Sequence, residues 1–158
     1  MKSKRDNFNS ILSWDDKVKF IENYYPVGSV LYFKHKAFGD SEEEKYVVLT
    51  YLEDSVIYCL KINSNVSKYH KKLKKENNYT CILAKDYSFL RHSQSFINCM
   101  DVYTIPINDI IPQFENLFKG QISNQALSDI SKVIERLDDM TPDLQKKLLL
   151  SLKSYIIS

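Results

Sequence analysis

The sequence is poor in the residues that interrupt secondary structure and in those that build covalent or metal frameworks. Its 158 residues include three glycines, four prolines and three cysteines. So little glycine and proline excludes collagen-like chains and disordered segments rich in these residues. The cysteines, Cys59, Cys81 and Cys99, are odd in number and widely spaced, which matches neither a disulfide framework nor a zinc site. We expect reduced thiols that pack in apolar segments.

Long apolar runs and an excess of one charge are also absent. No stretch approaches the roughly 18 apolar residues of a membrane span, and the opening MKSKRDNFNS lacks the apolar segment of a signal peptide. The 22 basic and 20 acidic residues give a formal net charge of +2. This balance does not indicate a nucleic-acid-binding protein by bulk charge alone. We expect a cytoplasmic protein without a membrane segment.

Aromatic residues are abundant by contrast. The chain has 11 tyrosines and 8 phenylalanines, and 44% of its residues are hydrophobic against 27% that are charged. Aromatic side chains suit a pleated, half-buried surface, and this length suits one compact core. The composition therefore predicts a single well-packed domain with a substantial β component.

The order of the periodic segments predicts an α+β fold. Ser13, with Asp16 three residues later, forms a potential capping box for a helix that ends before Pro26. Six short runs rich in β-branched and aromatic residues follow, with turn-rich or charged segments between them. These predicted strands cover residues 27–34, 46–51, 56–62, 79–84, 95–99 and 102–107. With so few intervening helices, we expect a small, strongly bent antiparallel β-barrel.

The C-terminal part has a helical period. Ser123 is placed to cap one helix, and Thr141-Pro142 to begin a second that runs antiparallel to it. The apolar stripe of the second helix is wide, so this helix either packs within the domain or serves for association. The predicted organisation is an N-terminal helical segment (1–26), a barrel core (27–120) and a C-terminal helical hairpin (121–158), all in one domain.

Five short segments carry a resemblance to a known protein family. They are residues 28–32 (GSVLY), 45–50 (KYVVLT), 61–64 (KINS), 92–99 (HSQSFINC) and 119–123 (KGQIS). Their order, over roughly residues 27 to 137, resembles the PemK/MazF family of toxin-like proteins. The resemblance implies a bent β-barrel with flanking helices that cleaves single-stranded RNA. It also implies a homodimer and a partner antitoxin protein.

The chain departs from the family pattern at three positions. Lys45 stands where the family has a functional arginine, Tyr46 replaces a proline, and Asn63 replaces the threonine that precedes Ser64. These departures motivate two alternatives. The first is a non-catalytic barrel module that binds a protein partner through its helical tail. The second is a protein that binds nucleic acid without cleaving it.

Metal-independent RNA cleavage requires acid–base groups, and cations that stabilise the charged transition state. His92 is the candidate acid or base because histidine titrates near neutrality, although an ordinary loop histidine is the alternative interpretation. The adjacent Arg91 is suited to hold a phosphate through two hydrogen bonds. Ser64 and Ser95 would orient that phosphate, and Lys45 would add positive charge.

Further lysines are candidates for contacts with the RNA backbone. A basic connection between two predicted strands, SKYHKKLKKENN, combines lysines with nearby tyrosines that suit base stacking. Its alternative interpretation is a solvated charged loop. The RNA-binding candidates are Lys61, Lys68, Lys71, Lys72, Lys74, Lys75 and Lys85. Because the sequence has no HExxH, CxxC or glycine-rich phosphate-binding motif, we predict neither a metal nor a cofactor.

Overall fold

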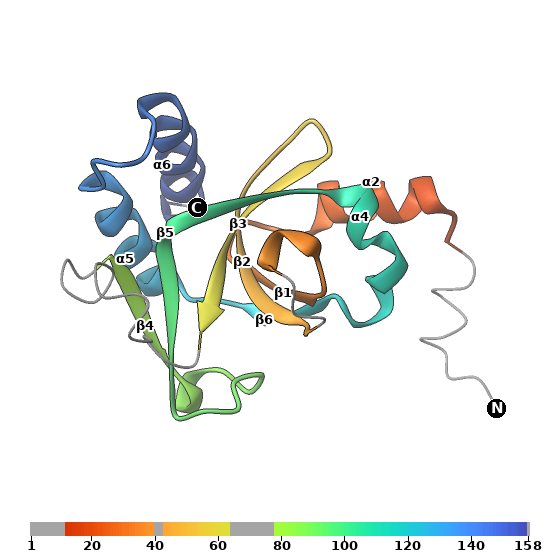
Figure 1. Cartoon of the computed structure of the whole chain (residues 1–158), viewed down its shortest axis with the longest axis horizontal. Coiled ribbons are helices and arrows are strands. Elements are labelled where there is room, and N and C mark those ends of the chain that lie inside the picture. The colour runs from red at the N-terminus through yellow and green to blue at the C-terminus, as the bar shows by residue number, and fades with distance from the viewer. Residues whose placement is uncertain (1–11, 40–42, 64–77, 158) are drawn as a thin grey trace.

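The computed structural model describes residues 12–39, 43–63 and 78–157 (Figure 1). Its strands are β1 (Ser29–Phe33), β2 (Lys45–Glu53), β3 (Val56–Asn63), β4 (Tyr79–Leu83), β5 (Gln94–Pro106) and β6 (Phe118–Gln121). Its α-helices are α2 (Trp14–Tyr24), α4 (Ile107–Ile110), α5 (Asn124–Glu135) and α6 (Pro142–Ile157). Three short 3-10 helices complete it: η1 (Lys36–Phe38), η3 (Ala84–Asp86) and η4 (Ile111–Asn116).

The strands form one antiparallel sheet in the order β4-β5-β3-β2-β1-β6. The sheet curls into a half-barrel whose edges are β4 and β6. The predicted α+β fold, with an N-terminal helix, six antiparallel strands and C-terminal helices, is therefore confirmed. The hairpin between β2 and β3 turns through Asp54 and Ser55, which adopt φ values of 52° and 60°. Two left-handed residues in a two-residue loop suit the natural twist of a hairpin.

Two details of the strand prediction are wrong. The predicted strands 95–99 and 102–107 are parts of the single strand β5, which runs past an irregularity opposite Lys61. The sixth strand is β6, a segment of four residues that the sequence analysis did not assign to the sheet. Its sequence, FKGQ, is short, polar and interrupted by glycine, so it has no alternating pattern. Pairing with β1 determines its conformation.

The sheet has a hydrophobic core on each face. Figure 1 shows α5 and α6 on one side of the sheet and α2 and α4 on the other. Successive strand residues point to opposite faces. In β3, Leu60 therefore belongs to the core covered by α5 and α6, the α5–α6 core, whereas Cys59 belongs to the core covered by α2, α4 and η4, the α2–α4 core.

Local capping residues fix the helices. Ser13 and Asp16 form the predicted capping box of α2, and Ser123 accepts a hydrogen bond from the Ala126 amide at the start of α5. In α6, Leu148 and Leu152 are 0% exposed, so this helix packs within the domain. Along the described ranges, no helix has both the length and the hydropathy that a membrane span requires.

The connection between β4 and β5 crosses to the far edge of the curled sheet. The Tyr87 hydroxyl accepts a hydrogen bond from the Ser123 amide at 3.0 Å and lies 3.2 Å from the Ser123 hydroxyl. Phe89 lies against Gly120 in β6, where an added Cβ would be 3.2 Å from the ring. This connection carries Arg91 and His92, and the charge of Arg91 acts on Tyr32 in β1.

Candidate functional site

Antiparallel pairing brings five of the twelve predicted site residues, Lys45, Lys61, Arg91, His92 and Ser95, towards one end of the sheet. Phe33 pairs with Lys45, and Asn63 pairs with Phe96, so β1 and β3 end where β2 and β5 begin. Arg91, His92 and Ser95 lie just before or within the start of β5. The structure does not describe six other predicted residues, which lie in the gap between 63 and 78: Ser64, Lys68, Lys71, Lys72, Lys74 and Lys75.

Two of the predicted lysines meet on the α2–α4 side of this end. Lys61 is partly buried, and its Nζ lies 5.9 Å from the centre of the Tyr103 ring. Burial, and then the ammonium group of Lys45, lower the pKa of Lys61, while the carboxylate of Asp101 opposes this effect. We call Lys45, Lys61, Asp101 and Tyr103 the lysine site.

An irregularity in β5 positions Asp101. Leu60 pairs with Val102 and Ile62 with Ile97, so residues 98–101 of β5 face the single residue Lys61. Within this bulge, Asn98 is 1% exposed, and its Nδ2 donates a hydrogen bond to Asp101 Oδ2 at 3.1 Å. The Met100 amide donates in turn to Asn98 Oδ1 at 2.9 Å. The bulge therefore holds the carboxylate in place before any ligand binds.

The remaining two members of the lysine site differ in their contacts. Tyr103 packs edge-on against Phe38, with ring centres 5.2 Å apart, and burial followed by the Asp101 charge raises its pKa. Lys45 forms an ion pair of 3.2 Å with the exposed Glu43. Such a surface pair contributes only about 0–1 kcal/mol, so a phosphate can replace it. The site thus combines a packed phenol and a hydrogen-bonded carboxylate with two ammonium groups.

An aromatic surface lies on the opposite side of β2, because Tyr46 and Lys45 point to opposite faces. The rings of Tyr32 and Tyr46 stack with centres 4.3 Å apart and an interplanar angle of 29°. Phe89 extends this surface, with its ring centre 5.8 Å from that of Tyr46, and Lys119 Nζ lies 5.5 Å from the Tyr32 ring centre. Burial and the nearby Glu44 carboxylate raise the pKa of Tyr32, and the Arg91 charge opposes them.

The other predicted residues have different surroundings. Arg91 and His92 are exposed, and His92 forms no hydrogen bond or ion pair with another residue in the described ranges. Lys85 is exposed on η3, outside the lysine site. Ser95 is 4% exposed on the α5–α6 core side of β5, so its hydroxyl is not open to a phosphate. The predicted residues that the structure describes therefore do not form one constellation.

A second histidine has a structural role. His35 Nδ1 accepts a hydrogen bond from the Ala37 amide at 3.0 Å, which leaves the proton on Nε2 facing Asp109 at 2.8 Å. Both ring nitrogens are engaged, so His35 is not available as an acid or base for a substrate. No group of three or more potential metal-ligating side chains occurs in the part of the chain that the structure describes.

Sequence reasoning missed Asp101 and Tyr103. The available signal was the polar interruption at Asn98 and Asp101 in an otherwise apolar stretch, INCMDVYTI. That interruption was interpreted as a break between two strands. In the structure it is a bulge that directs a carboxylate towards Lys61, and bulges of this kind are common next to functional sites.

Comparison with known proteins adds no assignment. The chain matches no protein-family model, no curated protein and no solved structure. These results neither support nor refute the resemblance to the PemK/MazF family. The functional argument therefore depends on the residues and geometry of the lysine site and the aromatic surface.

Proposed function

We propose that the protein is a cytoplasmic, metal-independent endoribonuclease that acts on single-stranded RNA at the lysine site. The observation that carries this proposal is the partly buried Lys61 between Lys45, Asp101 and Tyr103. The resemblance to the PemK/MazF family supports it, because Lys45 occupies the position of the family's functional arginine. On the same resemblance we propose a homodimer that a partner protein neutralises.

The lysine site contains the groups that such a reaction needs. Asp101 would accept the proton of the ribose 2′-hydroxyl as its oxygen attacks the adjacent phosphorus. The bond from phosphorus to the 5′-oxygen would break, and Lys61 would donate its proton to that leaving oxygen. Lys45 would stabilise the extra negative charge on the phosphoryl oxygens. The products are a 2′,3′-cyclic phosphate and a free 5′-hydroxyl.

The aromatic surface offers a place for bases beside this chemistry. Unpaired bases stack on aromatic side chains, and Tyr32, Tyr46 and Phe89 are partly exposed. Arg91 and Lys119 add positive charge at this surface. This arrangement also favours a second candidate function, the binding of single-stranded RNA without cleavage, because stacking and phosphate contacts do not require the lysine site to react.

One experiment separates cleavage from binding alone. The purified protein would be incubated with a mixed single-stranded RNA pool and a chelator, and the cut ends mapped. We expect Lys61→Met to lower the cleavage rate by roughly 100-fold or more, because it removes the proton donor. Lys85→Met, which removes an exposed ammonium outside the site, is the matched control and should cleave normally. His92→Ala tests the histidine predicted from the sequence.

Each outcome has a distinct meaning. Cleavage that is lost in Lys61→Met and kept in His92→Ala supports the lysine site, whereas the reverse would transfer the acid–base role to His92. If the folded parent protein cuts no RNA, its binding to a labelled single strand would be measured as salt increases. Affinity that falls steeply with salt and falls again in Tyr46→Leu would establish binding without cleavage.

A further inference from the structure

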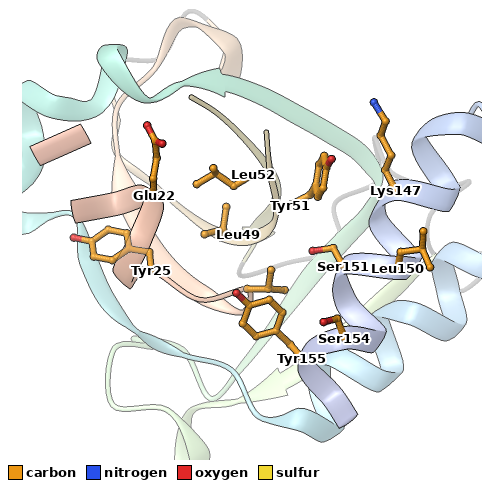
Figure 2. A pocket seen from close by; sticks show the side chains of 11 residues that line it. Glu22, Tyr25, Leu49, Tyr51, Leu52, Lys147, Leu150, Ser151, Ser154 and Tyr155 are labelled. Carbon is orange, nitrogen blue, oxygen red and sulfur yellow. The ribbon is translucent and has the colours of Figure 1, made fainter. Parts of the chain in front are cut away.

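A cleft lies between α2, β2 and α6, at the opposite end of β2 from the lysine site (Figure 2). Its volume is ≈ 480 Å³, within the range of cavities that hold small molecules. Its floor is apolar and consists of Val27, Leu49 and Leu52. The cleft is therefore a second candidate binding site, independent of the proposed ribonuclease function.

The walls of the cleft are aromatic. Tyr25 at the end of α2, Tyr51 in β2 and Tyr155 in α6 all line the cleft. Figure 2 shows the Tyr155 ring directed towards the middle of the cleft. Tyr155 is 40% exposed and the neighbouring Leu150 is 64% exposed, so the apolar surface continues to the rim. Serine hydroxyls of α6 also line the cleft, and Ser151 donates a hydrogen bond to the Thr50 carbonyl oxygen at 2.8 Å.

The two charged residues of the cleft, Glu22 and Lys147, lie on opposite sides of it with Leu49 and Leu52 between them. Lys147 is already paired, because its Nζ lies 3.2 Å from Glu53 Oε2 and 3.7 Å from Asp143 Oδ2.

Glu22 is different. It accepts a hydrogen bond from the Ser55 hydroxyl at 2.9 Å, and among the described residues no ammonium or guanidinium group forms an ion pair with it. The uncompensated charge at the cleft is therefore the negative charge of Glu22.

We propose that the cleft binds a small organic cation, an ammonium group carried on an apolar body. The ammonium would pair with the Glu22 carboxylate, because carboxylates attract cations. The apolar body would cover the leucine floor. An anionic ligand of the same size is disfavoured, because the Glu53 and Asp143 carboxylates beside Lys147 would repel it.

The test compares two ligands of similar size and opposite charge, phenethylamine and 3-phenylpropionate. Each would be titrated into the full-length ¹⁵N-labelled protein, and the dissociation constant taken from backbone amide shifts. We expect phenethylamine to bind at least tenfold more tightly and to shift amides around Glu22, Tyr51 and Tyr155. Glu22→Gln should weaken phenethylamine binding on the order of tenfold, because the amide keeps the shape and removes the charge.

The matched control is Glu115→Gln, which removes an exposed carboxylate outside the cleft and should leave the affinity unchanged. Equal affinity for the two ligands, no binding of phenethylamine, or equal effects of the two glutamine variants would each overturn the proposal. Thermal unfolding of both variants would confirm that they fold. RNA cleavage would be measured in parallel and should not change in Glu22→Gln, so the cleft and the ribonuclease proposal can fail independently.

Discussion

At the scale of single residues, the proposed chemistry depends on how its surroundings change Lys61. Burial and the Lys45 ammonium lower its pKa from the ordinary value of 10.5. A lysine with a lowered pKa is a better proton donor to a leaving alkoxide, provided that it is protonated at the working pH. The geometry of the lysine site therefore predicts a specific dependence of cleavage on pH.

On the alkaline side of the profile, we expect cleavage to fall as pH rises through the lowered pKa of Lys61, because the leaving oxygen then loses its proton donor. The alkaline limb of the rate profile should thus lie below pH 10.5, the ordinary value for lysine. Lys45→Met should move this limb to higher pH, because it removes the positive charge that disfavours a protonated Lys61. The measurement is the initial rate on a fluorescent single-stranded oligonucleotide across pH, with spontaneous hydrolysis subtracted. A limb that stays in place in Lys45→Met would contradict the coupling.

Residue-scale features could be predicted where their cause is local. The capping box of Ser13 and Asp16 and the cap at Ser123 follow from residues three positions apart, so the sequence alone shows them. The role of Asp101 has a remote cause, because its partner Lys61 is 40 positions away and meets it only through the pairing of β3 with β5. No local pattern shows such a contact.

At the scale of elements, the strength of the periodic pattern decided what could be predicted. The helices α2, α5 and α6 and the strands β1 to β4 carry clear periods and were found close to their observed bounds. The strand β6 and the short helix α4 have no pattern of their own, and tertiary contacts determine them. In β5 the bulge at 98–101 interrupts the alternation, so one strand looked like two.

The role of α6 as part of the core gives a prediction with a matched control. Leu148→Ala should lower the free energy of unfolding by about 2–5 kcal/mol, because it leaves a cavity at a side chain with 0% exposure. Leu150→Ala, two positions away and 64% exposed, should change it by less than about 0.5 kcal/mol. Urea denaturation of both variants is the measurement. Equal small effects would show that α6 is not part of the core, and would favour the alternative of a tail that binds a protein partner.

At the scale of the whole molecule, the central feature is a sheet that is buried on both faces. Cys59 lies in the α2–α4 core, Cys99 in the α5–α6 core, and Cys81 is exposed. Burial raises the pKa of the Cys99 thiol to about 12, and it also raises that of Cys59. The two buried thiols therefore report separately on the two cores.

We expect Cys81 to react at once with a thiol reagent near pH 8, and Cys59 and Cys99 to react only when the protein opens. The strand β3 contributes side chains to both cores, so we expect the two helical layers to separate from the sheet together. The two buried cysteines should then become exposed together and react at the same rate. The measurement is labelling under native conditions, with the modified cysteines identified by mass spectrometry. Clearly different rates would show that the two helical layers open independently.

The α+β fold could be predicted at this scale, because it depends on the number and order of periodic segments. The burial of both faces of the sheet could not be predicted, because strands buried on two faces differ little in sequence from strands in a barrel. The cleft was also beyond prediction. It brings together α2, β2 and α6, which are far apart in the chain, and no motif marks its residues.

The two-faced sheet also constrains how the sequence can change over evolution. Along β2, Val47 and Leu49 serve the α2–α4 core, while Val48 between them serves the α5–α6 core. A loss of volume at one position can be compensated only on the same face, two residues along the strand or across to its partner. Among related chains, size changes at Val48 should therefore be accompanied by changes at Val30 or Leu60, and should be independent of its immediate neighbours.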